Sequence, residues 1–221
     1  DAAEVHGQTY KDKKCGSFGD VSTFSFYPNK HITTGEGGMI VTDDEHIADK
    51  SRKLRNLYFE PPQRFVHKEL GFNFRMTNIQ AALGVAQLEK LDQHVILKRK
   101  IGNLYNDLLK DIDHIQLPIT KTEYSENIYW VYSIVLDNNI GKNANQVMQE
   151  LGKNQIGTRP FFYPMHQQPI LQKLGFKRNA DNCPVSENIA KYGFYLPSGL
   201  GITESEISTV CKTLRSVLNE Q

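Results

Sequence analysis

The feature that most constrains the fold is a lysine between two strand-like segments, in the stretch "FSFYPNKHITTGEGGMIV" from Phe24 to Val41. Val21 to Phe26 is rich in β-branched and aromatic residues, and Gly38 to Thr42 is a short apolar strand candidate. We expect both strands to belong to a parallel sheet, buried on both faces and paired on both edges. Lys30 is then either a reactive amine or a solvated turn residue that hydrogen-bonds the glycine loop.

Helical patterns predict a change of architecture along the chain. Thr77-Asn78-Ile79-Gln80 is a capping box that opens the longest helical pattern, which ends near Leu109. We expect a domain boundary near residues 112 to 120, followed by a small α+β domain. The other segments with clear signals are a helix capped by Asp43 or Asp44, a strand from Tyr129 to Leu136, a helix over Ala144 to Leu151 with Gly152 at its C′ position, and a last helix opened by a capping box from Thr203 to Glu206.

Composition excludes several classes of protein. The 221 residues carry a formal net charge of +1, which gives no electrostatic reason to bind nucleic acid or an anionic membrane. No apolar stretch approaches the length of a membrane span. The three cysteines lack metal-binding spacing and, in their odd number and wide separation, are typical of a reduced cytoplasmic protein. The opening "DAAEVHG" resembles the middle of a domain, so we expect the chain to be the C-terminal part of a longer protein.

The residues near Lys30 favour the reactive amine. A lysine attacks carbonyl groups only when its amine is neutral, which requires desolvation or a neighbouring cation. Ser25 precedes Lys30 by five residues, where its hydroxyl could hold a phosphate. Asp1 could keep a pyridinium nitrogen protonated. A lysine that binds an aldehyde, an aspartate for the ring nitrogen and donors for the phosphate are together the requirements of a pyridoxal phosphate site.

These segments closely resemble the DegT/DnrJ-type sugar aminotransferases, a fold-type I family that depends on pyridoxal phosphate. The resemblance runs from "DAAEVHG" and the Lys30 block through "LGFNFRMTNIQAALGVAQLEKLD" (Leu70 to Asp92) and "TRPFFYPMHQQP" (Thr158 to Pro169) to "YLPSG" (Tyr195 to Gly199). It implies an α/β fold in which residues 1–115 form the C-terminal part of the large domain, including the long linking helix. Residues 116–221 then form the small C-terminal α+β domain.

The resemblance also implies a role for individual residues. Lys30 corresponds to the lysine that binds the cofactor covalently and moves protons during catalysis. Around it, Asp1 is expected at the ring nitrogen, Glu4 near the phenolic oxygen and Ser25 at the phosphate. Asn73 corresponds to a residue that reaches across a homodimer interface to the partner's cofactor phosphate. For substrate binding, the resemblance implies Arg75, Tyr163 and His166; no metal is implied.

Each assignment has a structural alternative. Asp1 could be a frayed terminus, Glu4 a surface carboxylate and Ser25 an ordinary strand serine. The remaining alternatives are that Asn73 and Arg75 cap or brace the following helix and that Tyr163 and His166 are core or interface residues. His31, next to the lysine, is expected to be structural rather than an acid–base group.

The function implied by the resemblance is transfer of an amino group from glutamate to a nucleotide-linked 4-keto-6-deoxy sugar, for cell-surface polysaccharide. Thr158 to Pro169 most resembles the perosamine synthases, which act on GDP-4-keto-6-deoxymannose. A regulatory, non-catalytic relative and a sugar dehydratase are the alternatives. Because family members are nearly twice as long, and their N-terminal half supplies a ring-stacking residue and phosphate donors, we expect this chain alone to be inactive.

Overall fold

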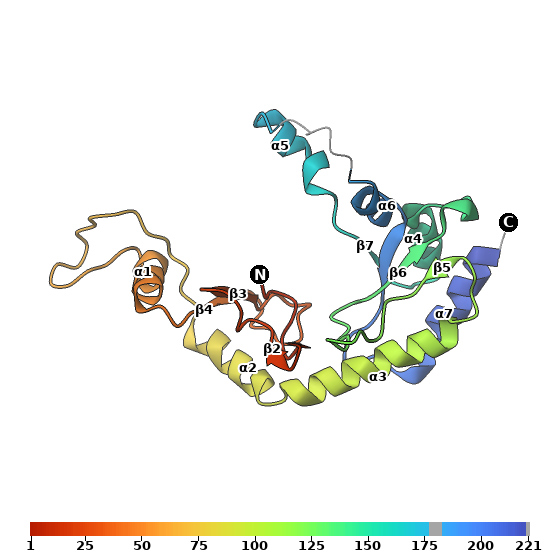
Figure 1. Ribbon diagram of the computed structural model, residues 1–221, viewed down its shortest axis with the longest axis horizontal. Coiled ribbons are helices and arrows are strands. Elements are labelled where there is room, and N and C mark those ends of the chain that lie inside the picture. Colours follow the sequence, from red (N-terminus) through yellow and green to blue (C-terminus); the bar gives the residue numbers. More distant parts are fainter. Residues whose placement is uncertain (177–182, 220–221) are drawn as a thin grey trace. The chain divides into compact units, whose positions relative to one another are not determined.

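The computed structural model describes residues 1–176 and 183–219 (Figure 1). The chain divides into two compact units. The first unit contains Asp1–Leu97 and Lys121–Trp130, and the second contains Lys98–Thr120 and Val131–Gln221. The prediction of domains at 1–115 and 116–221 concerns the whole protein and stays a prediction.

The first unit is built around two short hairpins and three helical segments. Its elements are β1 (Thr9–Tyr10), β2 (Lys13–Lys14), β3 (Ser22–Ser25), β4 (Gly38–Val41), α1 (Glu45–Arg55), α2 (Asn78–Leu88) and the beginning of α3 (Leu91–Leu109). β1 pairs with β2 and β3 pairs with β4, both antiparallel. As predicted, Asp44 caps α1 by accepting hydrogen bonds from two backbone N–H groups of its first turn.

The predicted parallel arrangement of the two strands beside Lys30 is wrong. Ser22 lies opposite Val41 and Ser25 opposite Gly38, so the strands form an antiparallel pair. The connection turns back on itself, since Phe26 donates to the Gly37 carbonyl at 2.9 Å and accepts from the Thr34 N–H at 3.1 Å. A chain that reverses so tightly returns beside itself in the antiparallel sense, whereas parallel neighbours require a long crossover. All four β4 residues are exposed among the described residues, so burial of this strand is also not observed.

The single long helix predicted after Thr77 is divided into two. Thr77 forms the predicted capping box with Gln80 at the start of α2. At the far end, the Lys90 N–H bonds to the Gln87 carbonyl three residues back, and α3 begins at Leu91. This tighter i to i−3 bond replaces the α-helical one and ends the regular ladder. The hydrophobic pattern continued through the break and therefore did not reveal it.

The second unit is a four-stranded antiparallel sheet with helices packed against it. Its strands are β5 (Ile115–Gln116), β6 (Tyr132–Leu136), β7 (Arg159–Pro160) and β8 (Gly193–Leu196), in the order β5-β6-β8-β7. Its helices beyond the end of α3 are η1 (Asn138–Ile140), α4 (Ala144–Lys153), η2 (Met165–Gln167), α5 (Pro169–Lys173), α6 (Pro184–Tyr192) and α7 (Glu204–Asn219). α4 and α6 contact β8, and α4 contacts α7 (Figure 1).

The core of this unit contains the predicted strand and the predicted stripe of the last helix, together with β8, which was not predicted. All of β8 is buried, and Ile134 and Leu136 of β6 are buried with it. The predicted stripe of α7 is buried too, including Ile207 and Leu214, and the Thr203–Glu206 capping box is present at its start. β6 begins at Tyr132 rather than at Tyr129, because Tyr129 has a positive φ of 47° that ordinary strand geometry does not allow.

The end of α4 differs from the prediction that placed Gly152 at C′. The helix continues to Lys153, and Gln155 takes the left-handed position with φ 61°. The Ile156 N–H bonds to the Leu151 carbonyl and the Gln155 N–H to the Gly152 carbonyl, which is the Schellman pattern. Ile156 and Leu151 are both buried. Burial of these two apolar side chains favours this ending over one with Gly152 in the left-handed position.

None of the three cysteines, all of which lie among the described residues, is in a disulfide: Cys15 is half-buried, Cys183 is exposed and Cys211 is buried. Burial raises the pKa of the Cys211 thiol to about 11, so it is not a nucleophile at neutral pH. Throughout residues 1–176 and 183–219, no helix is both long enough and apolar enough to cross a membrane.

A buried lysine gives the second unit a testable pH dependence. Lys98 of α3 is 6% exposed, and its amine donates to the Ser198 carbonyl at 2.6 Å. Burial lowers the pKa of Lys98 to about 8, whereas the unfolded chain binds that proton up to about pH 10.4. Between these values the unfolded state binds more protons, so the free energy of unfolding should rise with pH. The expected rise is at most about 3 kcal/mol.

Urea unfolding of the protein and of Lys98→Met at pH 7.5 and pH 10 measures this effect. The methionine fills similar space without an ionisable group, so its stability should lack the Lys98 contribution. From pH 7.5 to pH 10, the free energy of unfolding of the wild type should therefore rise relative to that of Lys98→Met. Parallel pH profiles for both proteins would contradict this account.

Candidate active site

Lys30 is held in a buried position between the two paired strands. Its backbone N–H bonds to the Tyr27 carbonyl at 3.0 Å, and its side chain is 8% exposed. Its amine donates to Glu4 Oε1 at 2.9 Å, which forms an ion pair. The solvated turn lysine of the alternative interpretation is therefore not observed, and Glu4 is not a free surface carboxylate.

The glycine loop after Lys30 permits close packing. Gly37 has φ 154°, and a Cβ at this position would lie 2.5 Å from Thr34 Oγ1 and 2.6 Å from Met76 Cε. Thr33 fixes the same loop, since its hydroxyl donates to the Phe26 carbonyl at 2.8 Å. The side-chain amide of Gln87 in α2 accepts a hydrogen bond from the Thr33 N–H and donates one to the Thr33 carbonyl. The loop is thus fastened to β3 and to α2, and it sets the path of the backbone that follows Lys30.

Two histidines of the first unit are buried. His6 is 4% exposed, and its ring packs on Phe24 and Phe26 with centroids 5.5 and 5.9 Å away. Burial lowers the pKa of His6, and the charge of Lys30 lowers it further, so the imidazole is neutral at physiological pH. His31 is buried too, with Nε2 3.1 Å from the Ile128 carbonyl, which fits the structural role expected for it.

Trp130 covers the amine of Lys30. The Nζ atom lies 4.2 Å from the centroid of the indole ring. The indole N–H donates to the Asn29 carbonyl at 2.9 Å, one residue before the lysine. The amine therefore has a carboxylate and an aromatic face as its immediate neighbours.

The two remaining residues expected around the cofactor have local contacts. Asp1 Oδ1 accepts from the Ala3 N–H at 2.9 Å, and the next residue, Ala2, donates to the Thr23 carbonyl of β3. Ser25 Oγ accepts from the Tyr27 N–H at 3.3 Å. The N-terminal segment is thus tied to β3 through Ala2, and Asp1 is not frayed. Both side chains keep capacity for a ligand, since a carboxylate has a second oxygen and a hydroxyl that accepts can still donate.

Asn73 and Arg75 contact each other on an exposed segment. Arg75 Nε donates to Asn73 Oδ1 at 2.6 Å, and its guanidinium also reaches Asn56 Oδ1 at 3.4 Å. Asn73 pairs through its backbone with Asn56 in a β-bridge. These contacts run to the residue that follows α1, whereas the structural alternative placed them at the following helix, α2, whose cap is Thr77. Both side chains are exposed to solvent.

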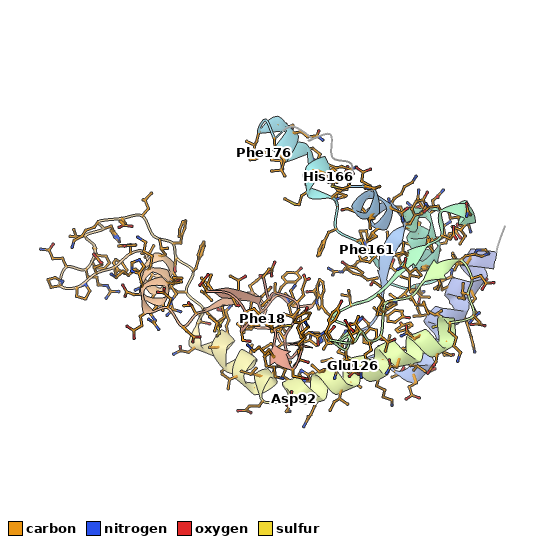
Figure 2. All side chains as sticks on the ribbon, in the orientation of Figure 1. Phe18, Asp92, Glu126, Phe161, His166 and Phe176 are labelled. Atoms are coloured by element: carbon orange, nitrogen blue, oxygen red, sulfur yellow. The ribbon has the colours of Figure 1, made fainter. Side chains whose placement is uncertain are left out.

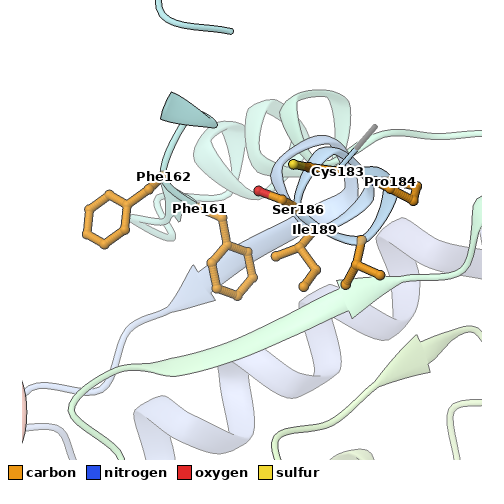
Figure 3. Close-up of a pocket in the computed structure, with 7 residues that line it drawn as sticks. Phe161, Phe162, Cys183, Pro184, Ser186 and Ile189 are labelled. Atoms are coloured by element: carbon orange, nitrogen blue, oxygen red, sulfur yellow. The ribbon is translucent and has the colours of Figure 1, made fainter. Parts of the chain in front are cut away.

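The second unit carries the other two predicted residues. Tyr163 is exposed, whereas His166 of η2 is half-buried and its Nε2 lies 2.9 Å from Glu187 Oε1 of α6 (Figure 2). Nearby, an apolar cavity of about 580 Å³ separates the segment after β7 from α6 (Figure 3). Its lining residues are Phe161, Phe162, Cys183, Pro184, Val185, Ser186 and Ile189. This cavity belongs to the second unit, and the reactive amine belongs to the first.

Sequence reasoning missed Trp130 and His6. Trp130 is the only tryptophan of the chain, but it lies a hundred residues from Lys30, and no periodicity or spacing connects the two. His6 stands two residues after Glu4, in the motif that carries Asp1, and could have been chosen from that motif.

A buried primary amine next to a carboxylate supports chemistry at a carbonyl carbon. The amine must lose a proton before it can attack, and Glu4 Oε1 accepts a hydrogen bond from it. The DegT/DnrJ/EryC1/StrS aminotransferase family matches residues 1–215 of the chain. The chain belongs to this family.

Relatives in the family agree with this assignment. The chain is 39% identical to "GDP-perosamine synthase" of Caulobacter vibrioides, over 99% of its own length and 58% of the relative's. It is 38% identical to "GDP-perosamine synthase" of Vibrio cholerae, again over 99% of its own length and 58% of the relative's. The chain thus spans less than two thirds of the curated relatives it matches.

A solved aminotransferase structure confirms the fold. "Helicobacter pylori PseC, aminotransferase involved in the biosynthesis of pseudoaminic acid" superposes with a TM-score of 0.90 at 24% identity. The match covers 100% of this chain and 59% of that chain. The predicted α/β fold class of the fold-type I transferases is therefore confirmed.

Proposed function

We propose that the intact protein is a pyridoxal phosphate-dependent aminotransferase, which transfers an amino group from glutamate to a nucleotide-linked 4-keto-6-deoxy sugar. The observation that carries this proposal is the buried amine of Lys30, 2.9 Å from Glu4 Oε1. The alternative of a sugar dehydratase is disfavoured, because the dehydratase relatives have histidine in place of this lysine. We also propose a cytoplasmic enzyme that acts as a homodimer.

The residues present fit pyridoxal phosphate. Lys30 would bind the aldehyde carbon through Nζ, and the carboxylate of Asp1 would bind the ring nitrogen. The Ser25 hydroxyl, which already accepts from Tyr27, would donate to a phosphate oxygen. Asn73 is proposed to donate to the phosphate of the partner protomer, for which its amide nitrogen is suited while its oxygen accepts from Arg75.

The bound cofactor supplies an electron sink for the carbanion that forms when an amino acid loses its α-proton. Lys30 Nζ serves as the base that removes and returns this proton once it is free. Glu4 Oε1 holds the amine in place by accepting a hydrogen bond from it. Asp1 keeps the ring nitrogen protonated by placing a negative charge beside it.

The preferred substrate is GDP-4-keto-6-deoxymannose, with GDP-perosamine as the product. Two relatives at 39% and 38% identity carry the name "GDP-perosamine synthase", which supports this choice. Arg75, Tyr163 and His166 are proposed to bind the nucleotide sugar. Tyr163 and Arg75 are exposed and can contact a ligand, and His166 is oriented by Glu187.

An assay with competing sugars tests the substrate. The intact protein should convert GDP-4-keto-6-deoxymannose and glutamate to the amino sugar and 2-oxoglutarate, measured by mass spectrometry. Matched UDP- and dTDP-linked 4-keto sugars should react at least about tenfold more slowly, because loss of well-placed nucleotide contacts costs binding energy. Faster turnover of either matched sugar would exclude the GDP-sugar while leaving the aminotransferase proposal intact.

A further inference from the structure

The contact between Trp130 and Lys30 is built from two independent interactions. The indole face lies 4.2 Å from the Lys30 amine, where the negative face of the ring attracts a cation. The indole N–H is bound to the Asn29 carbonyl at 2.9 Å. The ring is therefore tied to the backbone next to the residue whose side chain it covers, so its face cannot move away from the amine without breaking that hydrogen bond.

The segment that carries Trp130 is held firmly against the first unit. Its Tyr124 carbonyl accepts from the Lys11 N–H at 2.8 Å, and its Ile128 carbonyl lies 3.1 Å from Nε2 of His31, the residue after Lys30. Tyr129 has φ 47°, and Asn127 Oδ1 accepts from its N–H at 2.7 Å. A positive φ at a bulky residue costs free energy and persists only where the surroundings impose it. Here it turns the chain immediately before the indole.

We propose that Trp130 is a positioning residue for Lys30. The indole excludes water from one side of the amine and keeps the amine beside Glu4 Oε1, 2.9 Å away. This inference rests on the proposed function in one respect only: there the positioned amine is the group that binds the cofactor's aldehyde. The cover itself is a property of this chain and can be measured without cofactor.

A matched pair of variants separates the two interactions. Trp130→Phe keeps a ring face over the amine and loses the N–H donor, whereas Trp130→Gln keeps an N–H donor and loses the ring. Tyr124→Leu serves as a control from the same segment, because Tyr124 packs on Tyr10 with ring centroids 5.0 Å apart. Thermal melts of all variants establish that each is folded.

Acylation of the cofactor-free intact protein measures the cover directly. A limiting amount of acetyl-N-hydroxysuccinimide is added, and modification of Lys30 is quantified by peptide mass spectrometry relative to Lys50, whose amine lies over the Tyr58 ring instead. Trp130→Gln should acylate Lys30 about five- to tenfold faster than wild type, since the ring no longer covers the amine. Trp130→Phe should stay within about twofold of wild type, because its ring still offers a negative face. Tyr124→Leu should equal wild type.

Covalent capture of pyridoxal phosphate gives the second readout. After borohydride reduction, the fraction of Lys30 that carries a pyridoxyl group should fall several-fold in Trp130→Gln and recover in Trp130→Phe. If both variants behave as wild type in acylation and in capture, or if the Phe variant differs from wild type as much as the Gln variant does, the positioning role is wrong. If Trp130→Gln does not fold, the test rests on Trp130→Phe alone. A change of more than twofold in the acylation of Lys30, or in its capture of pyridoxal phosphate, then overturns the proposal. Absence of any pyridoxyl group on Lys30 of the wild type would instead refute the proposed function, whatever the acylation rates show.

Discussion

Replacing Lys30 with alanine should abolish amino transfer by the intact protein, with a fall in kcat of at least about a thousandfold, because the residue is both the attachment point and the proton carrier. The fold should survive, since the change removes one ion pair with Glu4 and one ring contact with Trp130. Steady-state turnover with glutamate and the keto sugar measures the loss. Far-ultraviolet circular dichroism and a thermal melt establish that the variant is folded.

Lys50→Ala is the matched control for this variant. Like Lys30, Lys50 contacts a glutamate and an aromatic ring of the first unit, through Glu69 and Tyr58. Its side chain is much more exposed, however, and no catalytic role is proposed for it. Turnover should remain within about twofold of wild type, because exposed ion pairs contribute little. Equal losses in both variants would mean that Lys30 acts only through stability, and retained turnover in Lys30→Ala would exclude it as the catalytic amine.

Mixing two inactive variants should restore activity if the sites are shared between protomers. Lys30→Ala and Asn73→Ala each disable one side of a site, but a heterodimer joins an intact Lys30 to an intact Asn73 from the other protomer. Random reassociation makes half of the dimers mixed, each with one working site, so about a quarter of the wild-type activity should return. The measurement is turnover after the two proteins are unfolded together and refolded.

The control for this mixture is each variant refolded by itself, which should stay inactive. Tagging the two variants differently and purifying through both tags confirms that heterodimers form. Purified heterodimers without activity would show that Asn73 serves its own protomer. The exposed position of Asn73, with Arg75 bound to its side-chain oxygen, is compatible with either arrangement, so this measurement decides between them.

The local signals in the sequence were reliable wherever the interaction itself is local. Thr77 with Gln80 and Thr203 with Glu206 form the capping boxes that their three-residue spacing predicts. Lys30 was chosen from its block; its side chain is buried against a carboxylate, and its catalytic role stays a prediction. The capping boxes depend on residues close in sequence, and the Lys30 block is a motif that can be found without knowing the tertiary fold.

The misses arose where distant residues decide the outcome. Burial of β4 was predicted from its apolar residues. Hydrophobicity alone does not determine which segment packs on a strand, and no described residue buries β4. The ending of α4 depends on the buried pair Leu151 and Ile156, which outweighs the preference of Gly152 for a left-handed position. Trp130 reaches Lys30 only through the tertiary fold, which a single sequence does not specify.

The most direct test of the account is the location of the cofactor on the intact protein. Pyridoxal phosphate is added, the protein is reduced with borohydride, and the pyridoxyl group is located by peptide mapping. We expect one group per protomer, on the peptide that contains Lys30, and its loss when glutamate is supplied before reduction. A pyridoxyl group on another lysine, such as the buried Lys98, or no stable group at all, would contradict the assignment of Lys30 as the catalytic amine.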